Sequence, residues 1–328
     1  MLEIVAVTIV IAILFDISNG WNDSANAIAT VVSTRVLTPR LAVALAATMN
    51  ILGALASTAV AKTIGTGVVD PTGISEGVVV SALLAGFLWN AAMTVMGLPV
   101  SASHALIGSL MGAAAAFAGW GVLNAEGLQK IFAALLISPV IGLAIGFLFM
   151  KFILRFFGYS SPGTLNKRFG RLQLVSSAFM AFSHGSNDAQ KVMGIITLSL
   201  FSGGYIPTID VPRWVVLVCA IAMGLGTAMG GWRVIRTIGM CMLRLEPVHG
   251  FAAETAATAV ILGASHAGLP VSTTHVITST IMGVGATRRL SAVRWGVAGR
   301  IVAAWLFTLP ACIGLAWVLE RFIVSRFL

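Results

Sequence analysis

An asparagine and an aspartate stand side by side at two points within long apolar segments of the chain. Asn22 and Asp23 form the first pair, and Asn187 and Asp188 form the second, 165 residues later. Ionisable side chains at membrane depth are costly, and they usually mark a substrate path, an ion path or a proton relay. The alternative is capping, because Asn and Asp are favoured at helix N-caps and the glycine two residues before each asparagine suits a helix break. Two copies favour a binding site over capping alone.

A second motif brings hydroxyl groups to the start of a helix. The segment Gly-Leu-Pro-Val-Ser-Ala-Ser-His ends at His104, and Gly-Leu-Pro-Val-Ser-Thr-Thr-His ends at His275, 171 residues later. Proline pre-sets the first turn of a helix, and the free N–H groups of that turn bind anions, including phosphate. Two facing helix starts would enclose a small oxyanion, whereas proline-kinked helices with hydroxyls bonded to their own carbonyls are the alternative. The candidate hydroxyl donors are Ser101, Ser103, Ser272, Thr273 and Thr274.

Histidines follow these hydroxyl groups closely. His104 and His275 end the two copies of the second motif, and His184 precedes the glycine of the second Asn-Asp motif. An unperturbed histidine titrates near neutral pH, so each of them could pass a proton. A buried neutral imidazole that bridges two helices is an equally good interpretation. We therefore count His104 and His275 among the candidate proton carriers.

The composition requires a membrane around these motifs. Of the 328 residues, 58% are hydrophobic and 9% are charged, whereas soluble domains carry about 25% charged residues. A membrane helix needs about 20 largely apolar residues, and the best candidates are 2–18, 41–61, 78–98, 129–150, 172–184, 214–232, 249–267 and 296–319. Shorter or interrupted apolar stretches, expected to be buried in protein or to line a cavity, are 22–34, 105–117, 190–201 and 271–285.

Both motifs recur in the same order, which indicates an internal duplication. The sequence predicts a first repeat at 1–155, a connector at 156–170 and a second repeat at 171–328. Loops that are rich in Lys and Arg in one half are poor in them in the other. By the positive-inside rule the two halves therefore have opposite orientations, with the connector in the cytoplasm and both termini outside.

Inverted repeats with broken helices are the sequence signature of a secondary transporter. We therefore expect an all-α polytopic membrane protein in which broken helices or re-entrant hairpins of two inverted-topology repeats meet near the bilayer midplane. The excess of 20 Lys and Arg over 11 Asp and Glu records this topology, so no nucleic acid is expected as a partner. The three cysteines have no metal or redox spacing.

The four motifs resemble those of the inorganic phosphate transporter (PiT) family, in the form of a short bacterial member. The first signature reads GWNDSANAIATVVSTRVLT, the second reads HGSNDAQKVMGIITL, and the hairpin motifs read GLPVSASH and GLPVSTTH. The resemblance covers essentially the whole chain. It implies import of inorganic phosphate across the bacterial inner membrane by alternating access, a homodimer with one pathway per protomer, and no cofactor beyond a coupling Na+ or H+.

The resemblance also assigns residues to the site. It implies that phosphate and the coupling ion are bound by Asn22, Asp23, Ser101, Ser103, Asn187, Asp188, Ser272, Thr273 and Thr274, with a possible Na+ at Asp23 and Asp188. One departure concerns Ala102 and Ser103, which stand where Ser or Thr followed by Thr is usual. Sulfate is therefore an alternative substrate, because some short bacterial members are associated with sulfate.

A difference between the halves bears on the coupling ion. Asn26 in the first half corresponds to Lys191 in the second. Sodium-coupled relatives resemble the first pattern in both halves, and a fixed ammonium beside Asp188 could take the place of a bound sodium ion. We therefore expect proton coupling in the second half, unless Lys191 only extends its charge to the membrane interface.

A different class of function is an intramembrane hydrolase, with Ser101 or Ser272 activated by His104 or His275. A nucleophile needs one base within hydrogen-bond reach and a third group to orient that base. Two copies of the arrangement in opposite orientations suit a carrier better than one catalytic centre, so the sequence predicts no enzyme activity.

Overall fold

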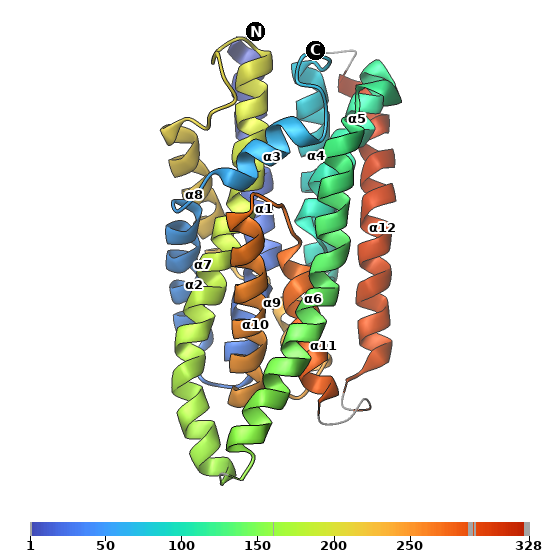
Figure 1. Ribbon diagram of the computed structural model, residues 1–328. Coiled ribbons are helices and arrows are strands. Elements are labelled where there is room, and N and C mark those ends of the chain that lie inside the picture. The colour runs from blue at the N-terminus through green and yellow to red at the C-terminus, as the bar shows by residue number, and fades with distance from the viewer. Residues whose placement is uncertain (1, 160, 288–290, 292, 325–328) are drawn as a thin grey trace.

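The computed structural model describes residues 2–159, 161–287, 291 and 293–324. Within these residues the chain is helical apart from its connections and one isolated β-bridge between Val69 and Leu123. Both ends of the described chain lie at one end of the molecule, and the helix that ends at Phe157 and the helix that begins at Pro162 meet at the other (Figure 1). The predicted all-α fold class is therefore confirmed.

The helices follow the same order before and after the connection at 158–161. The first set is α1 (Leu2–Ser33), α2 (Pro39–Ala54), α3 (Ala59–Gly67), α4 (Glu76–Met96), α5 (Ala102–Ala118), η1 (Trp120–Val122) and α6 (Ala125–Phe157). The second set is α7 (Pro162–Ser202), α8 (Arg213–Met229), α9 (Trp232–Arg236), η2 (Thr237–Cys241), α10 (Pro247–His266), α11 (Thr273–Ala286), α12 (Trp295–Leu319) and η4 (Glu320–Val324).

Four described helices are long and apolar enough to cross a membrane by length and composition: those at 3–33, 76–96, 125–157 and 295–324. Two bent pairs, α2 with α3 and α8 with α9–η2, raise the number to six if each pair is one span. The predicted spans at 172–184 and 249–267 are helical, but α7 and α10 do not pass this test. Many of the buried polar side chains lie on α7, and α10 carries the buried His249 and Glu254, which lowers the mean hydropathy of both helices.

The expected separation of 22–34 from 2–18, and of 190–201 from 172–184, is wrong. Both Asn-Asp motifs lie inside continuous helices, α1 and α7. The glycines before them serve close packing instead of a helix break. A Cβ at Gly20 would lie 2.5 Å from the carbonyl oxygen of Met223, and one at Gly185 would lie 2.1 Å from that of Asn50. Without a Cβ, the backbones of α8 and α2 can approach the motifs directly.

The breaks occur instead inside the predicted spans 41–61 and 214–232. The axis bends by 70° between α2 and α3 and by 63° between α8 and α9–η2. Side chains of the motif helices cap the interrupted helices. The Gln190 Oε1 atom accepts from the backbone N–H of Val60 at 2.8 Å, and the Ser24 hydroxyl accepts from that of Gly231 at 2.7 Å. Each motif helix thus stabilises a break in the opposite set of helices.

The packing of the two sets is reciprocal. Helix α1 packs on α8 and α4, and α7 packs on α2 and α10. In the same way α5 packs on α12, and α11 packs on α6. The pairs α1–α8, α2–α7, α5–α12 and α6–α11 join the two sets, so each set helps to bury helices of the other.

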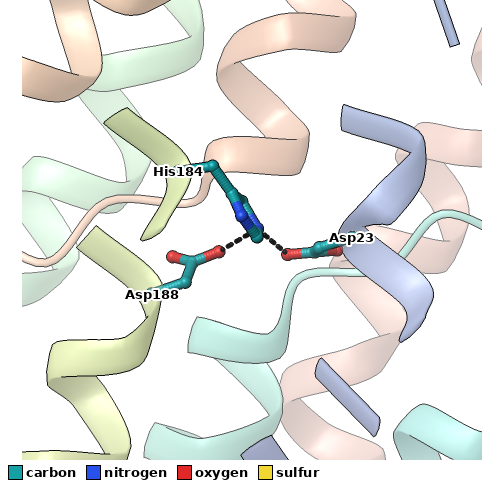
Figure 2. A group of neighbouring side chains, drawn as sticks. All are labelled: Asp23, His184 and Asp188. Carbon is teal, nitrogen blue, oxygen red and sulfur yellow. Dashed lines mark ion pairs between the residues drawn. The ribbon is translucent and has the colours of Figure 1, made fainter. Parts of the chain in front are cut away.

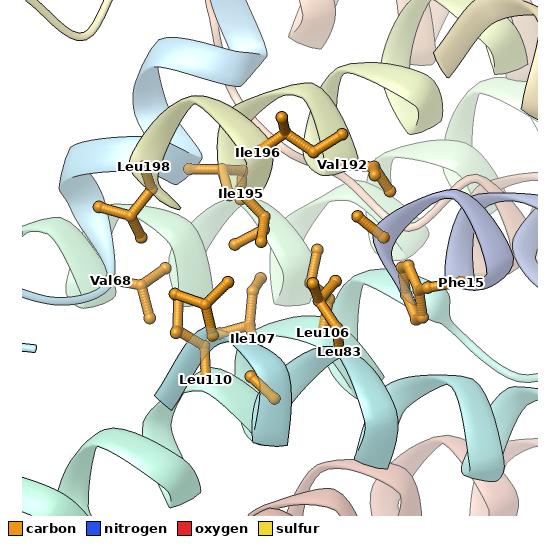
Figure 3. Packing of buried hydrophobic residues seen from close by; sticks show 14 of the residues in the cluster. Phe15, Val68, Leu83, Leu106, Ile107, Leu110, Val192, Ile195, Ile196 and Leu198 are labelled. Carbon is orange, nitrogen blue, oxygen red and sulfur yellow. The ribbon is translucent and has the colours of Figure 1, made fainter. Parts of the chain in front are cut away.

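Apolar side chains form two separate cores along α1 and α7. One includes Phe15 of α1 and residues from Ala189 onward on α7, and Figure 3 shows part of its packing. The other includes residues from Ala25 onward on α1 and residues up to Ala181 on α7. Between these two cores both helices carry the Asn-Asp motifs, so the polar centre is enclosed by apolar packing on both sides.

The close contact at Gly185 gives a first prediction. Replacing Gly185 with alanine should lower the free energy of unfolding by about 1–3 kcal/mol, because the added methyl group overpacks against the backbone of α2. Thermal unfolding of the purified protein in detergent measures this effect. Gly263→Ala on α10 is the matched control, since a Cβ there meets no atom within 4 Å. Equal unfolding temperatures for the two variants would contradict the packing role.

Candidate functional site

The centre of the site is a histidine between two aspartates. The Nε2 atom of His184 lies 3.5 Å from Asp23 Oδ2 and 3.0 Å from Asp188 Oδ2. Figure 2 shows the imidazole of α7 directed between the carboxylate of α1 and that of α7. All three side chains are buried. Each half of the chain therefore contributes one motif aspartate to a single group.

Hydrogen bonds from α2 and α8 orient this histidine. Thr227 donates to the carbonyl of Met223, so its oxygen accepts from Asn50 Nδ2 at 2.7 Å. The Oδ1 atom of Asn50 then faces His184 Nδ1 at 3.0 Å, which makes Nδ1 the donor. Nε2 lies between two carboxylates and can bond to them only through a further proton. The arrangement can therefore hold a proton, or a cation in its place, among His184, Asp23 and Asp188.

Lys191 completes the charge balance of the centre. Its ammonium donates to Asp188 Oδ1, to the Ser103 hydroxyl at 2.5 Å and to the carbonyl of Val271 at 2.9 Å. Lys191 is 1% exposed, so its charge does not reach an interface. A buried ammonium needs such partners, because an isolated buried charge is far more costly than a paired one. Lys191 and a protonated His184 together balance the two carboxylates.

The start of α11 supplies hydroxyl donors to both aspartates. Thr273 Oγ1 lies 2.7 Å from Asp188 Oδ2 and 3.4 Å from Asp23 Oδ2. Thr274 donates to Asp23 Oδ1 at 3.0 Å and accepts from Asn26 Nδ2 at 2.9 Å. Thr273 and Thr274, two of the predicted site residues, are therefore in direct contact with the centre, and they lie at a helix start as the motif predicts.

The motif asparagines point away from the aspartates. Asn22 donates to Thr94 Oγ1 at 2.8 Å and to the carbonyl of Leu98 at 3.4 Å. Asn187 makes the equivalent bonds to Ser265 Oγ at 2.8 Å and to the carbonyl of Leu269 at 3.5 Å. Each asparagine thus ties its helix to the turn before α5 or α11. This contact fixes where those helix starts lie relative to the aspartates.

The two motif serines cap their helices. Ser101 accepts from the backbone N–H of His104, and Ser272 accepts from that of His275, each at 3.2 Å. The two helix starts also touch each other, since Ser103 donates to the carbonyl of Val271 at 3.0 Å. The predicted meeting of α5 and α11 is therefore present in the structure.

Capping gives a second prediction. Ser101→Ala should cost about 1 kcal/mol of stability, whereas Ser101→Gly should cost only a few tenths, because glycine is itself a tolerated N-cap. Thermal unfolding of the two variants beside the wild type tests the difference. An alanine variant no less stable than the glycine variant would show that the hydroxyl has no capping role.

The two motif histidines lie in the first turns of α5 and α11 and contact each other. The rings of His104 and His275 are 4.7 Å apart, and His275 stacks on Trp305 at 3.9 Å. The Trp305 N–H donates to the carbonyl of Pro99 at 3.1 Å, and His104 Nδ1 lies 2.8 Å from Ser101 Oγ. No hydrogen bond joins either ring to Asp23 or Asp188 among the described residues, and a proton-carrying role for the pair stays a prediction.

Sequence reasoning gave His184 only a possible proton-carrying role, and it gave no role to Asn50, which orients His184, or to Gln190, which caps α3. His184 has no histidine counterpart in the first half, where position 19 is an asparagine, so duplication gave no signal for it. Asn50 and Gln190 act across helices that are distant in sequence.

Asp23, His184 and Asp188 are also grouped closely enough to hold a metal ion, their ligand atoms lying within 4.8 Å of one another. Their donor set of carboxylate oxygens and imidazole nitrogen suits a cation.

Comparison with known proteins adds an independent finding. A family model described as "Phosphate transporter family" matches residues 19–316. The "Probable low-affinity inorganic phosphate transporter" of Bacillus subtilis (strain 168) is 47% identical over 314 residues, with 94% of each chain covered. A protein of the same name from Rhizobium meliloti (strain 1021) is 46% identical over 305 residues, covering 92% of this chain and 91% of that one.

A solved structure is similar over the whole fold. It is titled "The sodium-dependent phosphate transporter" and superposes with a TM-score of 0.91 at 25% sequence identity. The match covers 99% of this chain and 100% of that one. Sequence and fold therefore point to the same group of proteins.

Proposed function

The chain belongs to the phosphate transporter family, and from this premise we propose that it is a secondary carrier that imports inorganic phosphate together with protons by alternating access. Family membership makes it a transporter embedded in lipid rather than an enzyme, as the sequence analysis predicts. The observation that carries the proposal is the central group in which Asp23 and Asp188, one from each half, share His184.

Phosphate fits the donors and acceptors of this group better than sulfate does. Thr273 and Thr274 offer hydroxyl donors, and Lys191 offers a cation. Asp23 and Asp188 offer acceptors, which a phosphate that still carries a proton can satisfy. Sulfate is a full dianion at working pH and has no proton to donate, so it would leave acceptors unpaired, which is costly in a buried site.

Proton coupling is supported by Lys191. Its ammonium contacts Asp188, which is where a sodium ion would be bound if the second half resembled the first. A fixed positive charge at that position excludes a second cation by repulsion. The solved relative is titled as sodium-dependent, and it therefore serves as the contrast for this part of the proposal.

The proposal includes two inverted repeats at 1–155 and 171–328, joined by a cytoplasmic connector at 156–170, with both termini outside the bacterial inner membrane. The reciprocal helix packing and the equivalent bonds of Asn22 and Asn187 support the duplication. The alternation of basic loops supports the inversion. A homodimer with one pathway per protomer follows from the family resemblance.

Uptake of labelled phosphate by proteoliposomes tests the proposal. We expect accumulation against a gradient when the outside is acidic, inhibition by a proton uncoupler, and no change when sodium replaces potassium at constant pH. Excess unlabelled sulfate should leave phosphate uptake unchanged. Uptake that rises with sodium and ignores the uncoupler would contradict proton coupling, and full competition by sulfate would favour a sulfate permease.

A further inference from the structure

Three polar side chains near the centre are buried without any hydrogen-bond partner in the described part of the chain. Asp16 and Asn19 lie on α1, Asn90 lies on α4, and each is 0% exposed. Both carboxylate oxygens of Asp16 are unpaired, and so are the amide oxygen and nitrogen of each asparagine. Unpaired buried polar groups are rare in folded proteins, and each calls for an explanation.

The contacts between α1 and α4 place the two asparagines at the same level. Phe15 of α1 packs on Gly86 of α4, where a Cβ would lie 2.8 Å from its ring. Two turns further along, Asn22 bonds to Thr94. Asn19 and Asn90 each lie one turn before the second of these contacts, so they share the interface between the two helices.

Asp16 shares this region and also faces the centre. It precedes Asn19 by three residues and Asp23 by seven, spacings that place all three on one face of α1. Ionisable groups from the neighbouring helices that interact electrostatically with it are His184, Asp188 and Lys191 on α7 and Cys219 on α8. The one ionisable residue of α4, Glu76, lies at the far start of that helix and bonds to Ser199.

The cations near Asp16 are already paired with other carboxylates. Lys191 contacts Asp188, and His184 lies between Asp23 and Asp188. Of the three carboxyls Asp16, Asp23 and Asp188, Asp16 is therefore the one without a counter-charge among the described residues. Burying a bare carboxylate is far more costly than burying a neutral carboxylic acid. As a neutral acid, Asp16 can donate its proton to an amide oxygen.

A bound sodium ion is a poorer explanation of the unpaired atoms. Carriers coordinate sodium largely with the backbone carbonyls of unwound helices. Here α1 is continuous from Leu2 to Ser33, so its carbonyls stay within the helix. The second half offers no equivalent carboxyl either, since Asp16 corresponds to Ala181 and Asn90 to Ile261. The second half thus carries the fixed positive charge of Lys191, and the first half carries Asp16, whose charge can change when it binds a proton.

We propose that Asp16 binds the proton that enters with phosphate, and that Asn19 and Asn90 hold the protonated carboxyl between α1 and α4. This inference rests on the proposed proton-coupled import. In the outward-open site one O–H bond forms at Asp16 as one O–H bond of a hydronium ion breaks, which leaves water. In the inward-open site the O–H bond at Asp16 breaks and a water molecule gains the proton, which leaves the carboxylate.

Asp16→Asn separates this role from a structural one. A gradient of one pH unit can drive about tenfold accumulation of phosphate with one proton. In the variant we expect that accumulation to disappear, together with the phosphate-dependent proton uptake reported by a pH dye inside the vesicles. Exchange of labelled for unlabelled phosphate needs no net proton release, so it should continue at a rate comparable to that of the wild type.

The controls make each failure informative. Asp16→Glu keeps a carboxyl and should restore accumulation. Glu126 is an exposed acid on α6, so Glu126→Gln should change neither assay.

Normal accumulation and proton uptake in Asp16→Asn would overturn the inference. Parallel loss of exchange in a variant that elutes and unfolds like the wild type would overturn it too. If Asp16→Asn does not fold, failure of Asp16→Glu to shift the pH dependence of accumulation overturns it. Wild-type protein without accumulation driven by the pH gradient would instead refute the proposed function.

Discussion

Replacing Asp188 with asparagine should lower phosphate uptake by about 100-fold or more, one of the two largest effects expected. Removing one partner of a buried ion pair costs about 3–5 kcal/mol, because the other charge is left buried and uncompensated. Asp188 is the partner of Lys191, of His184 at 3.0 Å and of Thr273 at 2.7 Å. The asparagine also places an NH2 group toward donors, which adds repulsion to the lost charge.

Initial uptake rates in proteoliposomes measure this loss, with the amount of inserted protein determined separately. Asp70→Asn is the matched control, because Asp70 lies exposed in the loop after α3. Its pKa is lowered by hydrogen bonds from the backbone N–H and the hydroxyl of Thr72, so its carboxylate is satisfied within its own turn. Uptake by Asp188→Asn at more than half the wild-type rate would remove Asp188 from the mechanism. Comparable loss in Asp70→Asn would show that the assay reports folding instead.

The sequence predicted the parts of the site that duplication repeats. Asp23, Asp188, Thr273 and Thr274 are in contact, as the two motifs indicate. Such residues can be found because each motif appears twice, in the same order, within apolar surroundings that do not explain its polarity. The role of Lys191 beside Asp188 was also accessible, since a spacing of three residues places both on one face of a helix.

The positions of the helix breaks could not be predicted in the same way. A glycine before each Asn-Asp motif suggested breaks there, but α1 and α7 continue because their glycines contact the backbones of α8 and α2. The break between α2 and α3 is capped by Gln190, which is 130 residues away from Val60. Sequence patterns report local preferences, whereas these caps and contacts exist only once the two sets of helices have packed together.

The repeated motifs also gave no sign that the two halves contribute different residues to the centre. His184 and Asp16 have no equivalent in the other half, so a search for repeated motifs passes over them. Their importance comes from burial and from partners on other helices: Asn50 orients His184, and no described group pairs with Asp16. Duplication therefore indicates where the site lies, while the differences between the halves determine how charge is distributed within it.

Lys191→Met should abolish uptake and lower the unfolding temperature, because it leaves Asp188 buried without its cation. The double variant Asp188→Asn with Lys191→Met should regain most of that stability, since replacing both members of a buried ion pair with neutral groups is often neutral or stabilising. Thermal unfolding of the two single variants and the double variant gives the coupling energy of the pair, which we expect to be in the range of about 3–5 kcal/mol measured for broken buried pairs.

Uptake by the double variant then separates the two roles of the pair. If Lys191 and Asp188 served only to hold α7 against the carbonyl of Val271 and the hydroxyl of Ser103, restored stability would bring restored transport. We expect the opposite, a stable protein without phosphate uptake, because the proposed import uses the ammonium as a fixed positive charge and Asp188 as the acceptor for a protonated phosphate. A double variant that transports at the wild-type rate would show that neither charge contacts the substrate.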